Sequence, residues 1–127
     1  MVQEEIKKAI FDIAKIVDVD PALAMAIAKI ESGFGFQQKS KTGARGIFQM
    51  TSIAMKDLLL YMESHTDDIV DILVGLAFLK VLSTRWNKDE QRIAEKYCDP
   101  KDRDWYPAKA LELAETYRRE IIDKFCR

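Results

Sequence analysis

A carboxylate at the end of an apolar helix is the residue of this 127-residue chain best suited to chemistry. Residues 21–32 have apolar side chains at helical spacing, and Glu31 continues the stripe that Ala24 and Ile27 begin. Burial beside apolar groups and the negative end of the helix dipole both disfavour a charged carboxylate. They predict a raised pKa for Glu31, as a general acid at neutral pH requires. The alternative is a boundary residue whose side chain bends into water.

Signals at both ends define the helix that carries this carboxylate. Asp20 can cap free amide groups, and Pro21 at the first helical position loses no hydrogen bond. Glycines begin at Gly33 and recur up to Gly46, which predicts a loop over 33–46. Glu31 is therefore expected on the last turn of a helix, facing a glycine-punctuated loop.

The residues around that loop form a pattern. It consists of Glu31-Ser32-Gly33-Phe34, then Ser40, then Gly43-Ala44-Arg45-Gly46-Ile47-Phe48-Gln49. It resembles the catalytic signature of the soluble lytic transglycosylases, lysozyme-like enzymes that cleave the glycan strands of peptidoglycan. The family pattern is Glu-Ser-x-Phe, a loop with a Ser, and Gly-Ala-x-Gly-Leu-Met-Gln, and it aligns with 31–49 without a gap. Ile47 and Phe48 depart from the usual Leu and Met, and a Phe before the Gln is similar to phage-encoded members.

The resemblance implies an all-α, lysozyme-like fold of about six helices with a substrate groove, built as one domain over 1–127. It implies that Glu31 is the catalytic acid, that Ser32 orients it or contacts substrate, and that Gln49 lies on the floor of the active site. Phe48 is expected to line the groove. Phe34 contacts substrate or anchors the loop to the core, and Gln49 can alternatively satisfy backbone groups of the loop.

The chain departs from the family after Tyr97. The family usually has Ala-Tyr-Asn followed by a glycine-rich turn. Tyr97 matches the Tyr of this pattern, and its hydroxyl is expected near the catalytic acid. Cys98 replaces the Asn, and residues 99–107 replace the turn. Trp105 and Tyr106 in this segment are expected either to stack on a sugar ring or to pin the loop to the core. Cys98 and Cys126 permit a disulfide but have no metal-ligand spacing, so two free thiols are the default.

Glycoside cleavage usually takes two carboxylates. Residues 32–50 contain no acid, and helical spacing and capping account for most of the later candidates, which are Asp57, Glu63, Asp67, Asp68 and Asp71. The resemblance implies a single-acid mechanism. Glu31 protonates the oxygen between N-acetylmuramic acid and N-acetylglucosamine and then deprotonates the muramic acid's 6-hydroxyl, which gives a 1,6-anhydro ring without cofactor or metal. The alternatives are a hydrolytic muramidase and a non-catalytic peptidoglycan-binding or assembly module.

Composition excludes several classes of protein. Twenty Lys and Arg against 21 Asp and Glu give a formal net charge of −1, so no basic field indicates nucleic-acid binding. The longest apolar run, 72–79, is far shorter than the roughly 20 residues of a membrane span. The N-terminal residues do not resemble a signal peptide. We expect a monomer that acts on peptidoglycan in the periplasm or outside the cell. It is expected to reach the cell wall by another route, for instance as a phage endolysin, or as part of a longer protein.

The remaining elements follow from apolar periodicity and capping residues. Helices are expected over 3–17, 21–32, Thr51 or Ser52 to about 63, 67–86, 87 to about 98, and 107–125. Thr66 and Asn87 are expected to cap the fourth and fifth. The 67–86 helix is apolar nearly all round, which predicts that it is the central buried helix. His65, just before it, is expected to be a surface turn residue.

Overall fold

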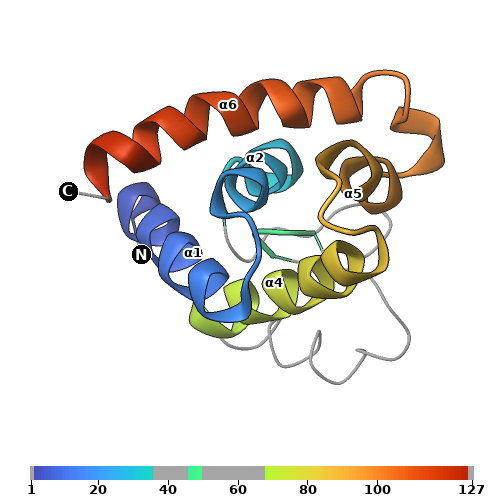
Figure 1. Cartoon of the computed structure of the whole chain (residues 1–127). Coiled ribbons are helices and arrows are strands. Elements are labelled where there is room, and N and C mark those ends of the chain that lie inside the picture. The colour runs from blue at the N-terminus through green and yellow to red at the C-terminus, as the bar shows by residue number, and fades with distance from the viewer. Residues whose placement is uncertain (1, 36–45, 50–67, 126–127) are drawn as a thin grey trace.

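The structure of the chain is a computed structural model that describes residues 2–35, 46–49 and 68–125. These residues form five α-helices and one short 3-10 helix, with no strand among them, so the all-α prediction is confirmed. The elements are α1 Gln3–Val17, α2 Pro21–Ser32, α4 Asp68–Arg85, α5 Glu90–Tyr97, η2 Pro100–Asp102 and α6 Tyr106–Lys124 (Figure 1).

Helix α2 is the central element of the described structure. Figure 1 shows it enclosed by α1, α4, α5 and α6, and every residue from Ala22 to Ala28 is buried. Four of those seven residues are alanines, whose small side chains let α1 and α6 pack closely against it. The prediction that the 67–86 helix is the central buried one is wrong. Helix α4 packs on α1 and α5 and leaves Ile69, Leu73 and Val81 at 40%, 45% and 50% exposure.

The expected signals start and end α2. The Asp20 carboxylate accepts hydrogen bonds from the amides of Ala22 (2.9 Å) and Leu23 (3.4 Å), and Gly33 ends the helix in the left-handed conformation (φ 65°). Phe34 follows with φ 64°, a conformation that costs a non-glycine residue roughly 1 kcal/mol or more. Its ring is 3% exposed and meets the Tyr117 ring edge-on at 5.7 Å. This burial offsets the strain and fixes the chain just after Glu31.

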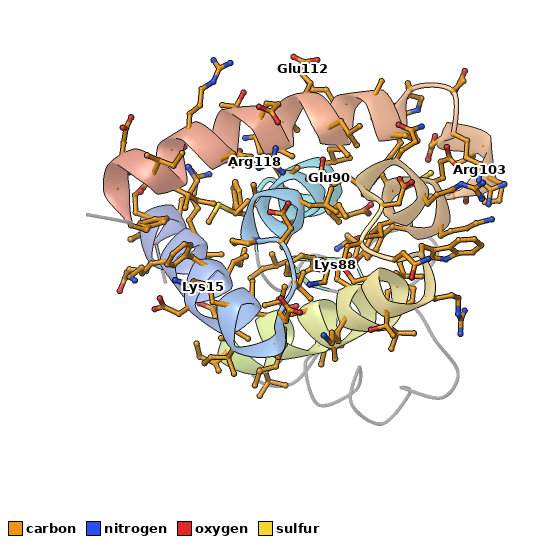
Figure 2. All side chains as sticks on the ribbon, in the orientation of Figure 1. Lys15, Lys88, Glu90, Arg103, Glu112 and Arg118 are labelled. Carbon is orange, nitrogen blue, oxygen red and sulfur yellow. The ribbon has the colours of Figure 1, made fainter. Side chains whose placement is uncertain are left out.

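Ion pairs join the helix starts at the end of the molecule opposite to Glu31. Arg118 of α6 contacts Asp20, the cap of α2, at 2.8 Å, and also contacts Glu90 at the start of α5. Figure 2 shows Arg118 and Glu90 lying together on the inner side of α6. These contacts fix the direction in which α2 runs toward its functional end.

Three predicted boundaries change. Asp89, not Asn87, caps α5: its carboxylate accepts from the Arg92 amide at 3.0 Å, whereas Asn87 and Lys88 adopt left-handed conformations (φ 53° and 60°) in the connection. Helix α4 ends at Arg85, one residue earlier than expected, and Asp67, its expected first residue, lies outside the described residues. Helix α6 begins one residue early, at Tyr106, which places that residue on the helix rather than in the loop.

Several predictions concern residues outside the described ranges. They are the 36–45 part of the loop with Ser40, the helix from Thr51 or Ser52 to about 63, the Thr66 cap, His65 and Cys126. Cys98 is a buried free thiol that donates weakly to the Glu95 carbonyl at 3.5 Å. In the described ranges, no helix combines the length and the apolar character that crossing a membrane needs.

Candidate functional site

Glu31 lies on the last turn of α2 and is partly buried. The hydroxyl of Tyr106, the first residue of α6, donates a hydrogen bond to its Oε2 atom at 2.5 Å. Tyr106 itself is only 2% exposed, so the packing of α6 on α2 determines where this hydroxyl lies. A residue of α6 that is 75 positions away in sequence thus holds one oxygen of the Glu31 carboxylate in place.

The surroundings of Glu31 favour its protonated form. Burial is the main cause that raises its pKa, the negative charge of Asp102 raises it further, and the hydrogen bond from Tyr106 opposes both. Burial and the charge of Glu31 raise the pKa of Tyr106 above its ordinary value of 10. Tyr106 therefore remains a hydrogen-bond donor at any physiological pH, while Glu31 is prepared to hold a proton.

The turn Gly46–Gln49 is hydrogen-bonded to Ser32, the residue after Glu31, and side chains of three helices hold it. Ser32 of α2 donates its hydroxyl hydrogen to the Ile47 carbonyl at 2.6 Å, and the Ile47 amide donates to Asp71 Oδ2 of α4 at 2.9 Å. From α5, the Tyr97 hydroxyl donates to the Phe48 carbonyl. Ser32 and Tyr97, both predicted site residues, are thus joined through this turn.

Asp71 is a buried carboxylate that the turn requires. It is 1% exposed, and burial raises its pKa from 3.8 to about 6. Gly46 has φ +79° and packs so closely that a Cβ on it would lie 2.2 Å from Asp71 Oδ1. A glycine at this position therefore serves both the backbone conformation and the approach of the turn to α4.

The charges of Glu31 and Asp71 both act on Tyr97. Burial is the main cause that raises the pKa of Tyr97, and these two carboxylates raise it further. Its hydroxyl is consequently a donor, held on the Phe48 carbonyl between the ends of α2 and α4.

The predicted aromatic contacts divide into buried and exposed residues. Phe34 and Phe48 are 3% and 0% exposed, so neither ring offers a surface to a sugar in this structure, and packing explains both. Phe48 lies against Gly75 of α4, where an added Cβ would come within 2.3 Å of its ring. Trp105, by contrast, is 47% exposed, and its ring centroid lies 5.5 Å from that of Tyr106.

The Gln49 side chain contacts the backbone of its own turn. Its Nε2 donates to the Gly46 carbonyl at 2.9 Å, and its backbone is left-handed at φ 51°. This contact is the one expected if Gln49 satisfies loop backbone groups. Its role on the active-site floor stays a prediction.

Three residues around Glu31 and its turn have contacts that the sequence did not predict. Tyr106 was expected to stack on a sugar ring or to pin the loop to the core, Asp71 was one of five candidates for a second carboxylate, and Asp102 was not a candidate. Asp102 accepts the indole N–H of Trp105 on its Oδ1 atom at 3.2 Å. The available signal was the departure from the family pattern after Tyr97, which marks the segment that contains Asp102 and Tyr106.

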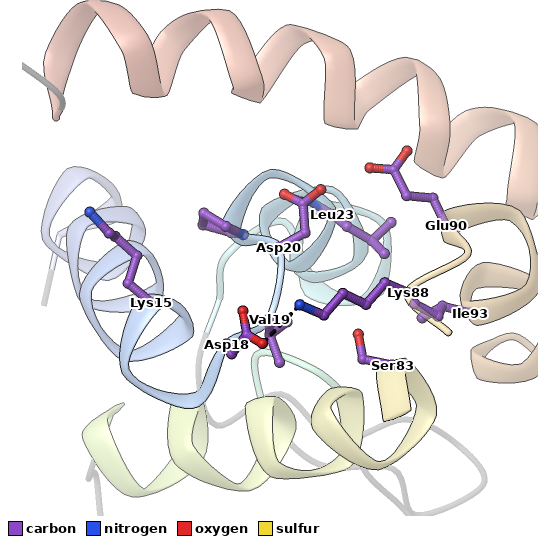
Figure 3. A pocket seen from close by; sticks show the side chains of 10 residues that line it. Lys15, Asp18, Val19, Asp20, Leu23, Ser83, Lys88, Glu90 and Ile93 are labelled. Carbon is purple, nitrogen blue, oxygen red and sulfur yellow. Dashed lines mark hydrogen bonds and ion pairs between the residues drawn. The ribbon is translucent and has the colours of Figure 1, made fainter. Parts of the chain in front are cut away.

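A pocket of about 370 Å³ lies at the other end of α2 (Figure 3). Asp18 and Lys88, which form an ion pair at 2.8 Å, line it together with Asp20 and Glu90. Asp20 and Glu31 are separated by about 16 Å along the helix axis at 1.5 Å per residue. This pocket is therefore not part of the site around Glu31.

Comparison with known families agrees with this geometry. The family described as the Transglycosylase SLT domain matches residues 8–121, which is most of the chain. No curated protein and no solved structure matched. The chain therefore belongs to the transglycosylase SLT domain family of the lysozyme-like superfamily, a family of lytic transglycosylases that act on the peptidoglycan of the cell wall.

Proposed function

We propose that this protein cleaves the β-1,4 bond between N-acetylmuramic acid and N-acetylglucosamine in peptidoglycan, with Glu31 as its single acid and base, and leaves 1,6-anhydromuramic ends. The observation that carries the proposal is the partly buried Glu31 carboxylate with its Oε2 fixed by Tyr106. Burial raises the pKa of this carboxyl group, which favours the protonated form that a general acid needs.

The reaction needs two proton transfers, one from Glu31 and one back to it from a different group. Protonated Glu31 gives its proton to the glycosidic oxygen, the bond from C1 of the muramic acid to that oxygen breaks, and N-acetylglucosamine leaves with a new hydroxyl. The Glu31 carboxylate then takes the proton of the 6-hydroxyl as that oxygen bonds to C1. The ring closes, Glu31 is protonated again, and no water is consumed.

The neighbouring residues position this carboxyl. Because Tyr106 donates to Oε2, the proton is expected on Oε1, which is left to meet the glycosidic oxygen. Ser32, the residue after Glu31, and Tyr97 hold the Gly46–Gln49 turn by hydrogen bonds to its carbonyls, and this supports a substrate contact by Gln49. In this proposal Tyr106, Ser32 and Tyr97 are positioning residues, and Gln49 contacts substrate.

A hydrolase is the second candidate, since one observation favours it. The charge of Asp102 raises the pKa of Glu31, so a second carboxylate lies near the acid. Hydrolysis with inversion would need it to activate a water. Asp102 already accepts the Trp105 indole N–H, which favours a structural role over that of a base.

The test is to digest purified peptidoglycan with the wild type and with Glu31→Gln and to identify the released muropeptides by mass spectrometry. Glutamine is nearly isosteric and still accepts from Tyr106, but it carries no transferable proton. The control is Glu112→Gln, because Glu112 projects outward from α6 (Figure 2), with its side chain 73% exposed. We expect anhydro ends from the wild type and the control and none from Glu31→Gln.

The other outcomes separate the alternatives. Reducing ends would indicate hydrolysis and direct attention to Asp102. Products from Glu31→Gln at near the wild-type rate would refute Glu31 as the acid. No products from several kinds of peptidoglycan would favour a binding or assembly module.

A further inference from the structure

The segment that replaces the family's glycine-rich turn is well ordered by its own hydrogen bonds. Asp99 accepts from the Lys101 amide at 3.1 Å, and the Asp102 amide donates to the Asp99 carbonyl at 2.8 Å, which closes η2. Arg103 Nε donates to the Glu95 carbonyl at 3.2 Å and ties the segment to α5. The side chains that this segment presents are therefore held in fixed places beside the start of α6.

Trp105 is the exposed member of this segment. Its indole N–H is already satisfied by Asp102 Oδ1, and its ring contacts the ring of Tyr106, whose hydroxyl holds Glu31. Trp105 is 47% exposed, and it directly precedes Tyr106, the hydrogen-bond partner of the proposed acid. Its indole N–H needs no further acceptor. Its face is available for a ligand with an apolar, C–H-bearing surface.

Asp102 determines what else such a ligand needs. An ionised carboxylate only accepts hydrogen bonds, and the indole uses one of its two oxygens. The other oxygen can accept from a hydroxyl or an amide N–H, and N-acetylglucosamine carries both beside a C–H-bearing ring face. The segment 99–104 contains three aspartates and two basic residues, Lys101 and Arg103, so its formal charge is negative.

This charge distinguishes the two sugars of the glycan strand. N-acetylmuramic acid carries a lactyl carboxylate or a peptide stem, and like charges a few ångströms apart repel. We propose that Trp105 and Asp102 form a sugar subsite beside Glu31 that accepts uncharged N-acetylglucosamine and disfavours a carboxylate-bearing muramoyl residue. The inference rests on the proposed function, because it assigns this subsite to the N-acetylglucosamine that leaves when the bond breaks.

Binding is tested in the Glu31→Gln background, so that no probe is consumed. The probes are chitotetraose, which is uncharged, and the alternating N-acetylglucosamine–N-acetylmuramic acid tetrasaccharide, which carries free carboxylates. Calorimetric titration gives Kd for both. We expect chitotetraose to bind more tightly, and Trp105→Ala to weaken its binding about tenfold, while Trp105→Phe stays within about threefold because it keeps an aromatic face.

The charge of Asp102 is tested with a substitution that keeps its contact. Asp102→Asn retains an oxygen that accepts the Trp105 indole N–H, and it removes only the charge. We expect the ratio of the two Kd values to shift about fivefold toward the muramic probe, and the shift to shrink at high salt. Asp104→Asn is the matched control, because Asp104 is an exposed aspartate of the same segment.

Two results would overturn the subsite. One is chitotetraose binding that is absent in the parent protein or unchanged by Trp105→Ala; the other is an equal shift of the ratio in Asp102→Asn and Asp104→Asn. Failure of the proposed function looks different, since the tetrasaccharides would bind as expected while the wild type releases no anhydro ends from peptidoglycan. A thermal melt of each variant verifies that the start of α6 still folds.

Discussion

Asp71→Asn is the substitution that best tests how the turn beside Glu31 is held. Asp71 is almost fully buried, and its Oδ2 accepts from the Ile47 amide. Asparagine keeps an oxygen for that amide and removes the titration. Replacement should therefore change how stability depends on pH, whatever it does to stability at a single pH.

The size and sign of the effect follow from the two pKa values. The folded pKa of Asp71, about 6, lies above the ordinary value of 3.8, so protonation favours the folded state. The destabilisation by its charge is absent at low pH, grows as the pH rises from about 4 to 6, and is complete above. Roughly two pKa units at 1.36 kcal/mol each give about 3 kcal/mol. About 2 kcal/mol of this falls between pH 4 and pH 7, because the unfolded carboxyl is already half ionised at pH 4.

Urea unfolding at several pH values measures this dependence. At each pH, the free energy of unfolding of the wild type is subtracted from that of Asp71→Asn. This subtraction removes the contribution of every other titrating group. This difference should rise by about 2 kcal/mol in favour of the variant from pH 4 to pH 7. Parallel stability curves for the two proteins would refute the claim that Asp71 is a buried carboxyl with a raised pKa.

Two further predictions concern packing and proton transfer. Gly75→Ala should destabilise the protein by about 1–3 kcal/mol in urea unfolding despite alanine's higher helix propensity, because its Cβ would lie 2.3 Å from the Phe48 ring. Gly33→Ala has open space around it and gives the backbone cost of replacing a left-handed glycine alone. A Gly75→Ala variant as stable as the wild type would contradict the packing argument. Tyr106→Phe removes a hydrogen bond that favours the Glu31 carboxylate, so the pKa of Glu31 should rise, and the limb where peptidoglycan cleavage declines with pH should move to higher pH. An unmoved limb would mean that Tyr106 does not act on the acid.

Local signals allowed α2 to be predicted from the sequence. Asp20 and Gly33 act through neighbours within a few positions, so the start and end of the helix, and with them the place of Glu31, follow from the residues themselves. Asn87 was the wrong cap because Asn87 and Asp89 are both good caps, and only the left-handed backbone at 87 and 88 decides between them.

Tertiary packing explains what could not be predicted. Tyr106 reaches Glu31 across 75 positions, and Asp71 reaches Ile47 across 24, and no sequence spacing encodes such pairs. Helix α4 looked central because it is apolar nearly all round, yet α2 takes that place because its alanines admit neighbours on every side. Phe48 matched a groove-lining position in the family pattern, but its burial against Gly75 depends on how the turn meets α4.

The separation in sequence of the residues that meet near Glu31 has a consequence for folding. The hydrogen bonds that involve Ser32, Asp71, Tyr97 and Tyr106 span 15, 24, 49 and 75 positions, so each closes a progressively longer loop of chain. The contact to Glu31 itself is the longest and needs α6 docked on α2. A partly folded chain can thus contain α2 complete with Glu31 and still lack the hydroxyl that orients it. The carboxylate acquires this partner only when α6 docks on α2, so the geometry proposed for cutting cell wall arises together with that packing.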